Sequence, residues 1–247
     1  MKKRKCNYKN VFKQPFETTK IFMPLVKSEE DFLEFIMKEQ SVSKEDQFSM
    51  ALLVNFYMAE KEKILEHLFI QDDSLFDFFK NTKIKVSDGL EKLLKENTGK
   101  YFVVHSKTQS FGFIVHKNEN EYAIAVFDEG KSNEELLTSV CKWRNLSDNE
   151  ACRKAVNLLF YMTAFPEKVR NGIPDDYRSV SVGSTKNKVI GKSERIISHS
   201  DSGKSTHFRS GFFRYYPKDS QHWKNVAGTS IWVDATVVNG KAKTIKE

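Results

Sequence analysis

The most informative segment for the fold class is YFVVHSKTQSFGFIVHKNENEYAIAVF, residues 101–127. It contains three β-rich runs, at 101–105, 111–116 and 122–127. The break Lys117-Asn118-Glu119-Asn120 between the last two runs has the composition of a hairpin turn. The stretch therefore predicts a three-stranded antiparallel meander.

The chain before the meander has helical periodicity. Ser28, followed three residues later by Asp31, predicts a helix over residues 28–40, and Ser43 opens a second, longer helix. The apolar positions assigned to the longer helix are Phe48, Leu52, Phe56, Ile64 and Leu68. Shorter helices are expected at 75–79 and 88–94, so that residues up to about 96 form a helical layer.

Helices are expected again after the meander, at 133–143 and 148–163, followed by a short β-like run at 180–182. The final segments, 208–216 and 230–238, are interpreted as two strands joined by a loop. The predicted fold class is α+β, with an N-terminal helical layer, a central antiparallel β-meander flanked by helices, and a basic C-terminal β-hairpin.

Charge is distributed unevenly along the 247 residues, whose net charge is +7. Residues 1–20 hold seven Lys/Arg against one acid, and residues 185–247 hold twelve against five, which leaves a net charge of −6 between them. We interpret the chain as a basic N-terminal arm (1–27), an acidic α+β body (28–184) and a basic aromatic C-terminal module (185–247) packed with the body. Two basic ends favour a polyanionic partner, although solvated basic termini would give the same pattern.

Several functional classes find little support in the sequence. No apolar run is long enough to span a bilayer, and the N-terminal charges precede no apolar stretch, which favours a cytoplasmic protein. Cys6, Cys141 and Cys152 lack C-x-x-C spacing and are interpreted as free structural thiols. The Gly203-Lys204-Ser205 ending imitates a phosphate-binding loop, but Ser198 stands where that motif needs glycine. We expect no cofactor and no metal site.

The strongest local signal for function is HFRSGFFRYY, residues 207–216. On a strand, side chains alternate between faces, so each face would carry one guanidinium, Arg209 or Arg214, beside aromatic rings. This arrangement suits stacking on bases with phosphate contacts, or clamping a peptide; the alternative is a hydrophobic strand with arginines at its edges. The candidate residues for binding nucleic acid or a partner are His207, Phe208, Arg209, Gly211, Phe213, Arg214, Tyr215 and Trp232.

A ribonuclease is the enzymatic alternative. His207 with His199 or His222 could act as general acid and base on an RNA phosphodiester, while Arg209 or Arg214 neutralises the developing charge. The histidine spacing matches no zinc signature. No residue is assigned a catalytic role on this evidence.

The segment 207–214, followed by a loop and then Ser230-Ile231-Trp232-Val233, resembles the C-terminal motif of a widespread phage and plasmid family that includes type V-A anti-CRISPR proteins. His207, Arg209, Gly211 and Trp232 match that motif. Its second histidine and its tryptophan are replaced here by Phe212 and Phe213, which argues against a mechanism that needs two histidines.

The resemblance implies an anti-defence role in the cytoplasm of a bacterial host, in which a CRISPR effector nuclease is suppressed during its translation. The implied partners are the nascent chain of the effector, its mRNA or the ribosome. A general RNA- or ribosome-binding module, a ribonuclease and a direct protein inhibitor of a defence enzyme remain alternatives.

Overall fold

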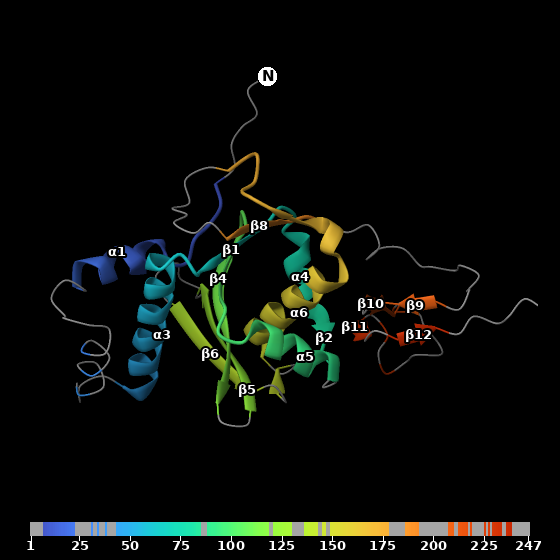
Figure 1. The fold of residues 1–247 in the computed structure, drawn as a ribbon, viewed down its shortest axis with the longest axis horizontal. Coiled ribbons are helices and arrows are strands. Elements are labelled where there is room, and N and C mark those ends of the chain that lie inside the picture. Colours follow the sequence, from blue (N-terminus) through green and yellow to red (C-terminus); the bar gives the residue numbers. More distant parts are fainter. Residues whose placement is uncertain are drawn as a thin grey trace, which may run out of the picture.

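A computed structural model describes most of the chain. The described residues are 7–22, 31, 34, 38, 43–84, 88–118, 121–129, 136–142, 145–146, 149–177, 186–192, 207–209, 212–216, 218, 225, 227, 229–233 and 236–238. The described part is an α+β fold in which helices pack on both faces of a large mixed sheet, and a smaller sheet lies beside it (Figure 1).

The large sheet has seven strands in the order β6-β5-β4-β3-β1-β8-β7. The strands are β1 Glu66–Ile70, β3 Tyr101–His105, β4 Ser110–Asn118, β5 Glu121–Glu129, β6 Leu136–Lys142, β7 Val169–Asn171 and β8 Asn187–Ile190. The predicted meander is present: β3, β4 and β5 pair antiparallel, and β6 extends the series. β1 runs parallel to both β3 and β8, which requires a crossover connection between β1 and β3.

The meander strands are apolar on both faces because both faces are covered. Phe111, Phe113 and Val115 of β4 belong to the larger core, whereas Ile114 belongs to the smaller one. The larger core also contains α4 Ser74–Asn81, α5 Asp88–Asn97 and α6 Glu150–Ala164. The smaller core lies under α1 Lys13–Phe22 and α3 Lys44–Lys61, on the opposite side of the sheet (Figure 1).

The N-terminal segment docks on the sheet through Phe12. Its ring stacks on Phe56 of α3, with 4.7 Å between centroids, and contacts Phe127 edge-on. A Cβ built on Gly112 of β4 would lie 2.3 Å from the Phe12 ring, so the close approach depends on glycine at that position.

Several predicted helices are present, with a side-chain cap at Ser43, where a start was predicted, and another at Asn149, within the segment predicted as a helix at 148–163. Ser43 Oγ accepts the Asp46 N–H at 3.1 Å before α3, and Asn149 Oδ1 accepts the Cys152 N–H at 3.0 Å before α6. The helices predicted at 75–79 and 88–94 correspond to α4 and α5. The predictions for 28–40, apart from positions 31, 34 and 38, and for 180–182 lie outside the described residues.

Two helix predictions were wrong because fully buried strands are as rich in apolar residues as buried helices. α3 ends at Lys61, Lys63 takes a positive φ of 60°, and residues 66–70 form the fully buried strand β1 instead of continuing the helix. The residues up to 96 are therefore not purely helical. The segment predicted as a helix at 133–143 contains β6, whose register with β5 buries Cys141 and exposes Val140.

The cysteines conform to the structural interpretation where they are described. Cys141 and Cys152 are free and buried. Burial and the neighbouring Cys141 raise the pKa of the Cys152 thiol, which therefore stays protonated. Cys6 lies outside the described residues. Among the helices that the structure describes, none is both long and apolar enough to cross a membrane.

Candidate nucleic-acid interface

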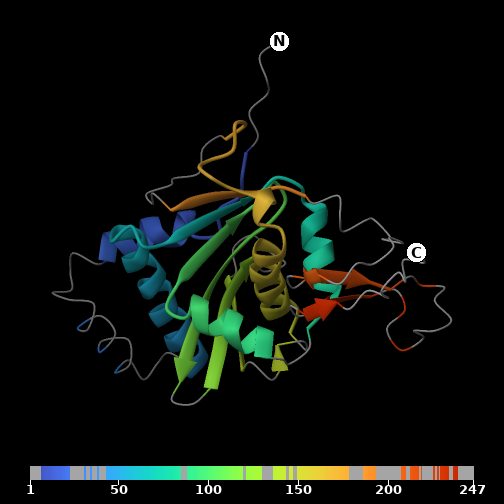
Figure 2. The same ribbon diagram turned by 45° about the vertical axis from the view of Figure 1, so that its right-hand side comes forward.

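The C-terminal strands form the predicted hairpin and add it to the body through a third strand. β10 Phe212–Tyr215 pairs antiparallel with β11 Ser230–Val233, and β9 His207–Arg209 pairs with β12 Thr236–Val238 in the same register. β11 also pairs in parallel with β2, Thr82–Lys83, directly after α4. The resulting order β10-β11-β2 joins segments almost 150 residues apart, on the side of the molecule occupied by α4 and α6 (Figure 2).

One face of this small sheet is turned toward the body. Trp232 of β11 is 8% exposed and stacks on Phe160 of α6, with 4.4 Å between ring centroids. Phe213, its cross-strand partner, meets Trp232 edge-on at 5.1 Å and Phe78 of α4 at 4.8 Å. Phe213 and Trp232 therefore anchor the hairpin on the body.

The opposite face carries a row of three cross-strand neighbours. Ile231 of β11 is paired with Arg214 of β10 on one side and with Lys83 of β2 on the other. Directly paired residues point to the same face of a sheet, so Arg214 and Lys83 flank the buried Ile231. Two strand spacings separate the Cα atoms of the two cations, about 10 Å. We call Lys83, Ile231 and Arg214 the outer row.

The two cations of the outer row are exposed, and the structure gives neither of them an acidic partner among the described residues. The Arg214 guanidinium lies over the Tyr216 ring, 5.6 Å from its centroid. Such stacking holds the guanidinium plane while leaving its N–H groups available to an anion.

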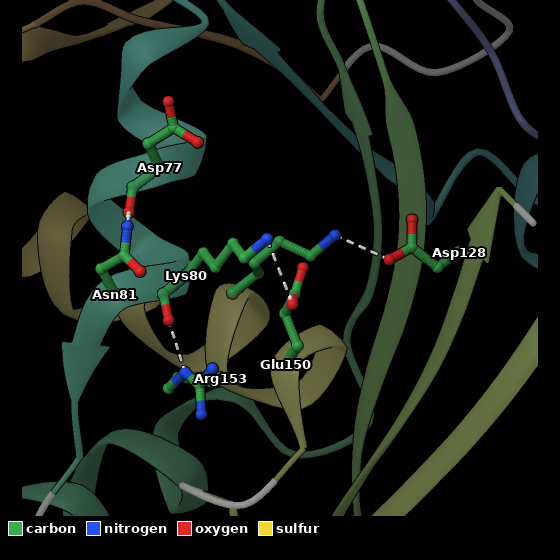
Figure 3. Close-up of polar contacts among 7 residues, drawn as sticks. Asp77, Lys80, Asn81, Asp128, Glu150 and Arg153 are labelled. Atoms are coloured by element: carbon green, nitrogen blue, oxygen red, sulfur yellow. Dashed lines mark hydrogen bonds and ion pairs between the residues drawn. The ribbon is translucent and has the colours of Figure 1, made fainter. Parts of the chain in front are cut away.

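Two cations of α4 and α6, Lys80 and Lys154, have acidic partners, which distinguishes them from the outer row. Lys154 Nζ on α6 lies 2.7 Å from Asp128 Oδ2, and its side chain is 6% exposed. Lys80 Nζ lies 3.4 Å from Glu150 Oε2, while Arg153 Nε donates to the Lys80 carbonyl (Figure 3). These contacts tie α6 to α4 and to β5.

The structure describes some of the predicted site residues with their side chains, some only as backbone, and others not at all. Phe213, Arg214, Tyr215 and Trp232 are described with their side chains, and Tyr215 is 46% exposed. His207, Phe208 and Arg209 are placed only as the backbone of β9, and Gly211 lies outside the described residues. The ribonuclease candidates His199 and His222, with the Gly203-Lys204-Ser205 segment, also lie outside them.

Lys83 is a site residue that sequence reasoning missed. It belongs to a strand of two residues, and its register beside Ile231 depends on a contact between distant segments. No local pattern marks such a strand.

A second polar cluster lies inside the large sheet. His67 Nδ1 on β1 lies 2.7 Å from His105 Nε2 on β3, and His67 Nε2 lies 2.9 Å from Glu60 Oε2 on α3. His105 Nδ1 donates to the Lys9 carbonyl at 3.0 Å. Burial, together with the electrostatic effect of the neighbouring His67, lowers the pKa of His105 to about 3.

The third histidine of the sheet, His116, is not part of this cluster, because the register pairs His105 with Ser110 and His116 with Ala123. No group of three potential ligands with metal-binding geometry occurs among the residues that the structure describes.

The chain was compared with protein families, curated proteins and solved structures. No protein family, no curated protein and no solved structure matches the chain.

Proposed function

We propose that the protein is a recognition protein that binds RNA across the outer row of the β10-β11-β2 sheet. The observation that supports this proposal is the position of two exposed cations, Lys83 and Arg214, on either side of Ile231 on one face, with the guanidinium over the Tyr216 ring. Cations attract the phosphates, and the half-exposed Tyr216 ring beside Arg214 can stack on a base without a strict sequence requirement.

RNA binding is tested by fluorescence anisotropy with a labelled single-stranded RNA at a series of salt concentrations. The double variant Lys83→Ala/Arg214→Ala should weaken binding and reduce the slope of log K against log salt by about 1.4, since each lost phosphate contact removes about 0.7. Lys117→Ala is the matched control, because Lys117 is also an exposed cation over a tyrosine ring, Tyr122, on the β4–β5 hairpin of the large sheet. Equal slopes for the wild type and the double variant would refute the proposal.

We further propose that the RNA belongs to a translating message of a CRISPR effector nuclease, which makes the protein an anti-CRISPR-like regulator of a mobile genetic element. This target rests on the C-terminal motif with His207, Arg209, Gly211 and Trp232. Co-expression with a type V-A effector should lower effector mRNA and protein, and the double variant should lose that effect. Unchanged effector mRNA and protein would refute this target, whereas the anisotropy result would still decide RNA binding.

A further inference from the structure

The half-buried Glu60 and the buried His67 and His105 form a continuous hydrogen-bonded chain that ends on the N-terminal segment. Its links are Glu60 to His67 at 2.9 Å, His67 to His105 at 2.7 Å, and His105 to the Lys9 carbonyl at 3.0 Å. His67 is 2% exposed and His105 is fully buried, so water does not replace a missing partner there.

Counting protons along this chain gives a definite result. Each of the three links needs one hydrogen between its two heavy atoms. The Lys9 carbonyl supplies none, and two neutral imidazoles supply two. The third hydrogen must be an additional proton, bound beyond neutral histidines and an ionised Glu60 carboxylate. This count holds whether His67 or Glu60 carries the extra proton.

We infer that the docking of the N-terminal segment on the large sheet is coupled to the binding of one proton by the Glu60–His67–His105 chain. Removing that proton leaves two hydrogens for three links. In one link the two heavy atoms would then point lone pairs at each other. Adding a fourth proton sets two N–H groups against each other in the histidine pair. Both changes break a chain whose last link holds Lys9.

The charged side chains near the histidine pair, Glu66 and Asp176, have partners outside the Glu60–His67–His105 chain. Glu66, next to His67 on β1, pairs with Lys188 of β8 at 2.7 Å. The Tyr8 hydroxyl donates to Asp176 at 3.0 Å. From α3, Glu60 is the carboxylate that faces His67, and from β3 it is His105 that faces it. The proton is therefore shared within the chain itself.

The His105–Lys9 hydrogen bond holds the N-terminal segment that leads into α1. The Lys9 N–H donates to the Ser106 carbonyl at 2.8 Å, directly beside His105, and Phe12 is buried three residues later. α1 follows from Lys13. Release of Lys9 would thus weaken the docking of a basic segment that otherwise lies along the smaller core.

Trypsin cleavage of the full-length protein after Lys9, followed by mass spectrometry between pH 7 and pH 9, tests the coupling. Unfolded histidines are neutral over most of this range, so loss of one proton should increase the released fraction about tenfold per pH unit. Glu60→Gln is the decisive variant, since its amide can donate the third hydrogen to a neutral His67. The ratio of the wild-type rate to the Glu60→Gln rate at each pH cancels the pH dependence of trypsin.

The expected result is a ratio that rises with pH, and His116→Gln should behave as the wild type does. A ratio that stays constant from pH 7 to pH 9 would overturn the inference. Nitrogen-15 spectra of the histidine rings and carbon-13 spectra of Glu60 in the wild type give a second test that does not depend on a variant. A neutral His67 beside an ionised Glu60 at pH 7 would also overturn it.

Discussion

Acidification from pH 7 to pH 5 should destabilise the protein through His105. The pKa of this histidine is lowered to about 3 in the folded protein, against about 6.5 in an unfolded chain. Between these pH values the His105 ring binds a second proton in the unfolded state but not in the folded state. The stability that the neutral His105 contributes is therefore present above pH 6.5 and is lost as the pH falls. The calculated loss between pH 7 and pH 5 is about 2 kcal/mol, which corresponds to roughly 4 to 8 °C in Tm for a chain of this size.

Urea unfolding of the wild type and of His105→Gln at both pH values measures this loss. The glutamine oxygen can still accept from His67 Nδ1, but the side chain does not titrate. Carboxylates that respond to acid elsewhere contribute equally to both proteins and cancel in the comparison. The variant should therefore lose about 2 kcal/mol less than the wild type between pH 7 and pH 5. Equal losses in the two proteins would refute the assignment of the acid sensitivity to His105.

Three substitutions test the packing that positions the candidate interface and the N-terminal segment. Trp232→Ala should cost about 3 to 5 kcal/mol in urea unfolding and weaken RNA binding, because the hairpin loses its stack on α6; a loss below 1 kcal/mol would contradict this anchoring. Asn157→Leu should cost about 2 kcal/mol or more, since its amide donates to two buried carbonyls at the end of α4 and in β2, at 2.7 and 2.8 Å; unchanged stability would contradict that role. Gly112→Ala should cost about 1 to 3 kcal/mol and speed trypsin cleavage of the N-terminal segment, because the new Cβ would displace the Phe12 ring; wild-type cleavage would show that the ring is not held there.

The meander could be predicted because its information is local. Residues 101–127 contain three short β-rich runs with a turn between the last two, and neighbouring strands pair without any distant contact. The caps at Ser43 and Asn149 are likewise local, since each side chain bonds an amide three residues later.

β1 and β6 could not be separated from helices by periodicity. All five residues of β1 are buried because helices and the segment around Tyr8 cover the two faces of the sheet, so the polar alternation of a half-exposed strand is absent. In β6 an apolar residue, Val140, stands at an exposed position, which weakens the same signal. Only pairing with β3, β8 and β5 identifies them as strands.

The candidate interface could be predicted only in part, because it also depends on contacts between distant segments. The aromatic and cationic content of residues 207–216 is visible, but which face packs inward depends on α4 and α6. The stack of Trp232 on Phe160 decides that Phe213 faces the body and Arg214 faces outward. The histidine chain joins three elements and a backbone carbonyl, so it has no signature in any single segment.

The outer row exists only when distant parts of the chain are folded together. Lys83 is held in β2, whose Thr82 carbonyl accepts from Asn157 of α6, while Arg214 comes from the C-terminal hairpin. β8, which lies in the basic C-terminal part of the sequence, is an interior strand of the large sheet between β1 and β7. An RNA that contacts Lys83 and Arg214 together therefore binds the folded state and not the unfolded chain. Such a ligand must stabilise the body as well as the hairpin, since binding energy gained only by the folded state adds to its stability.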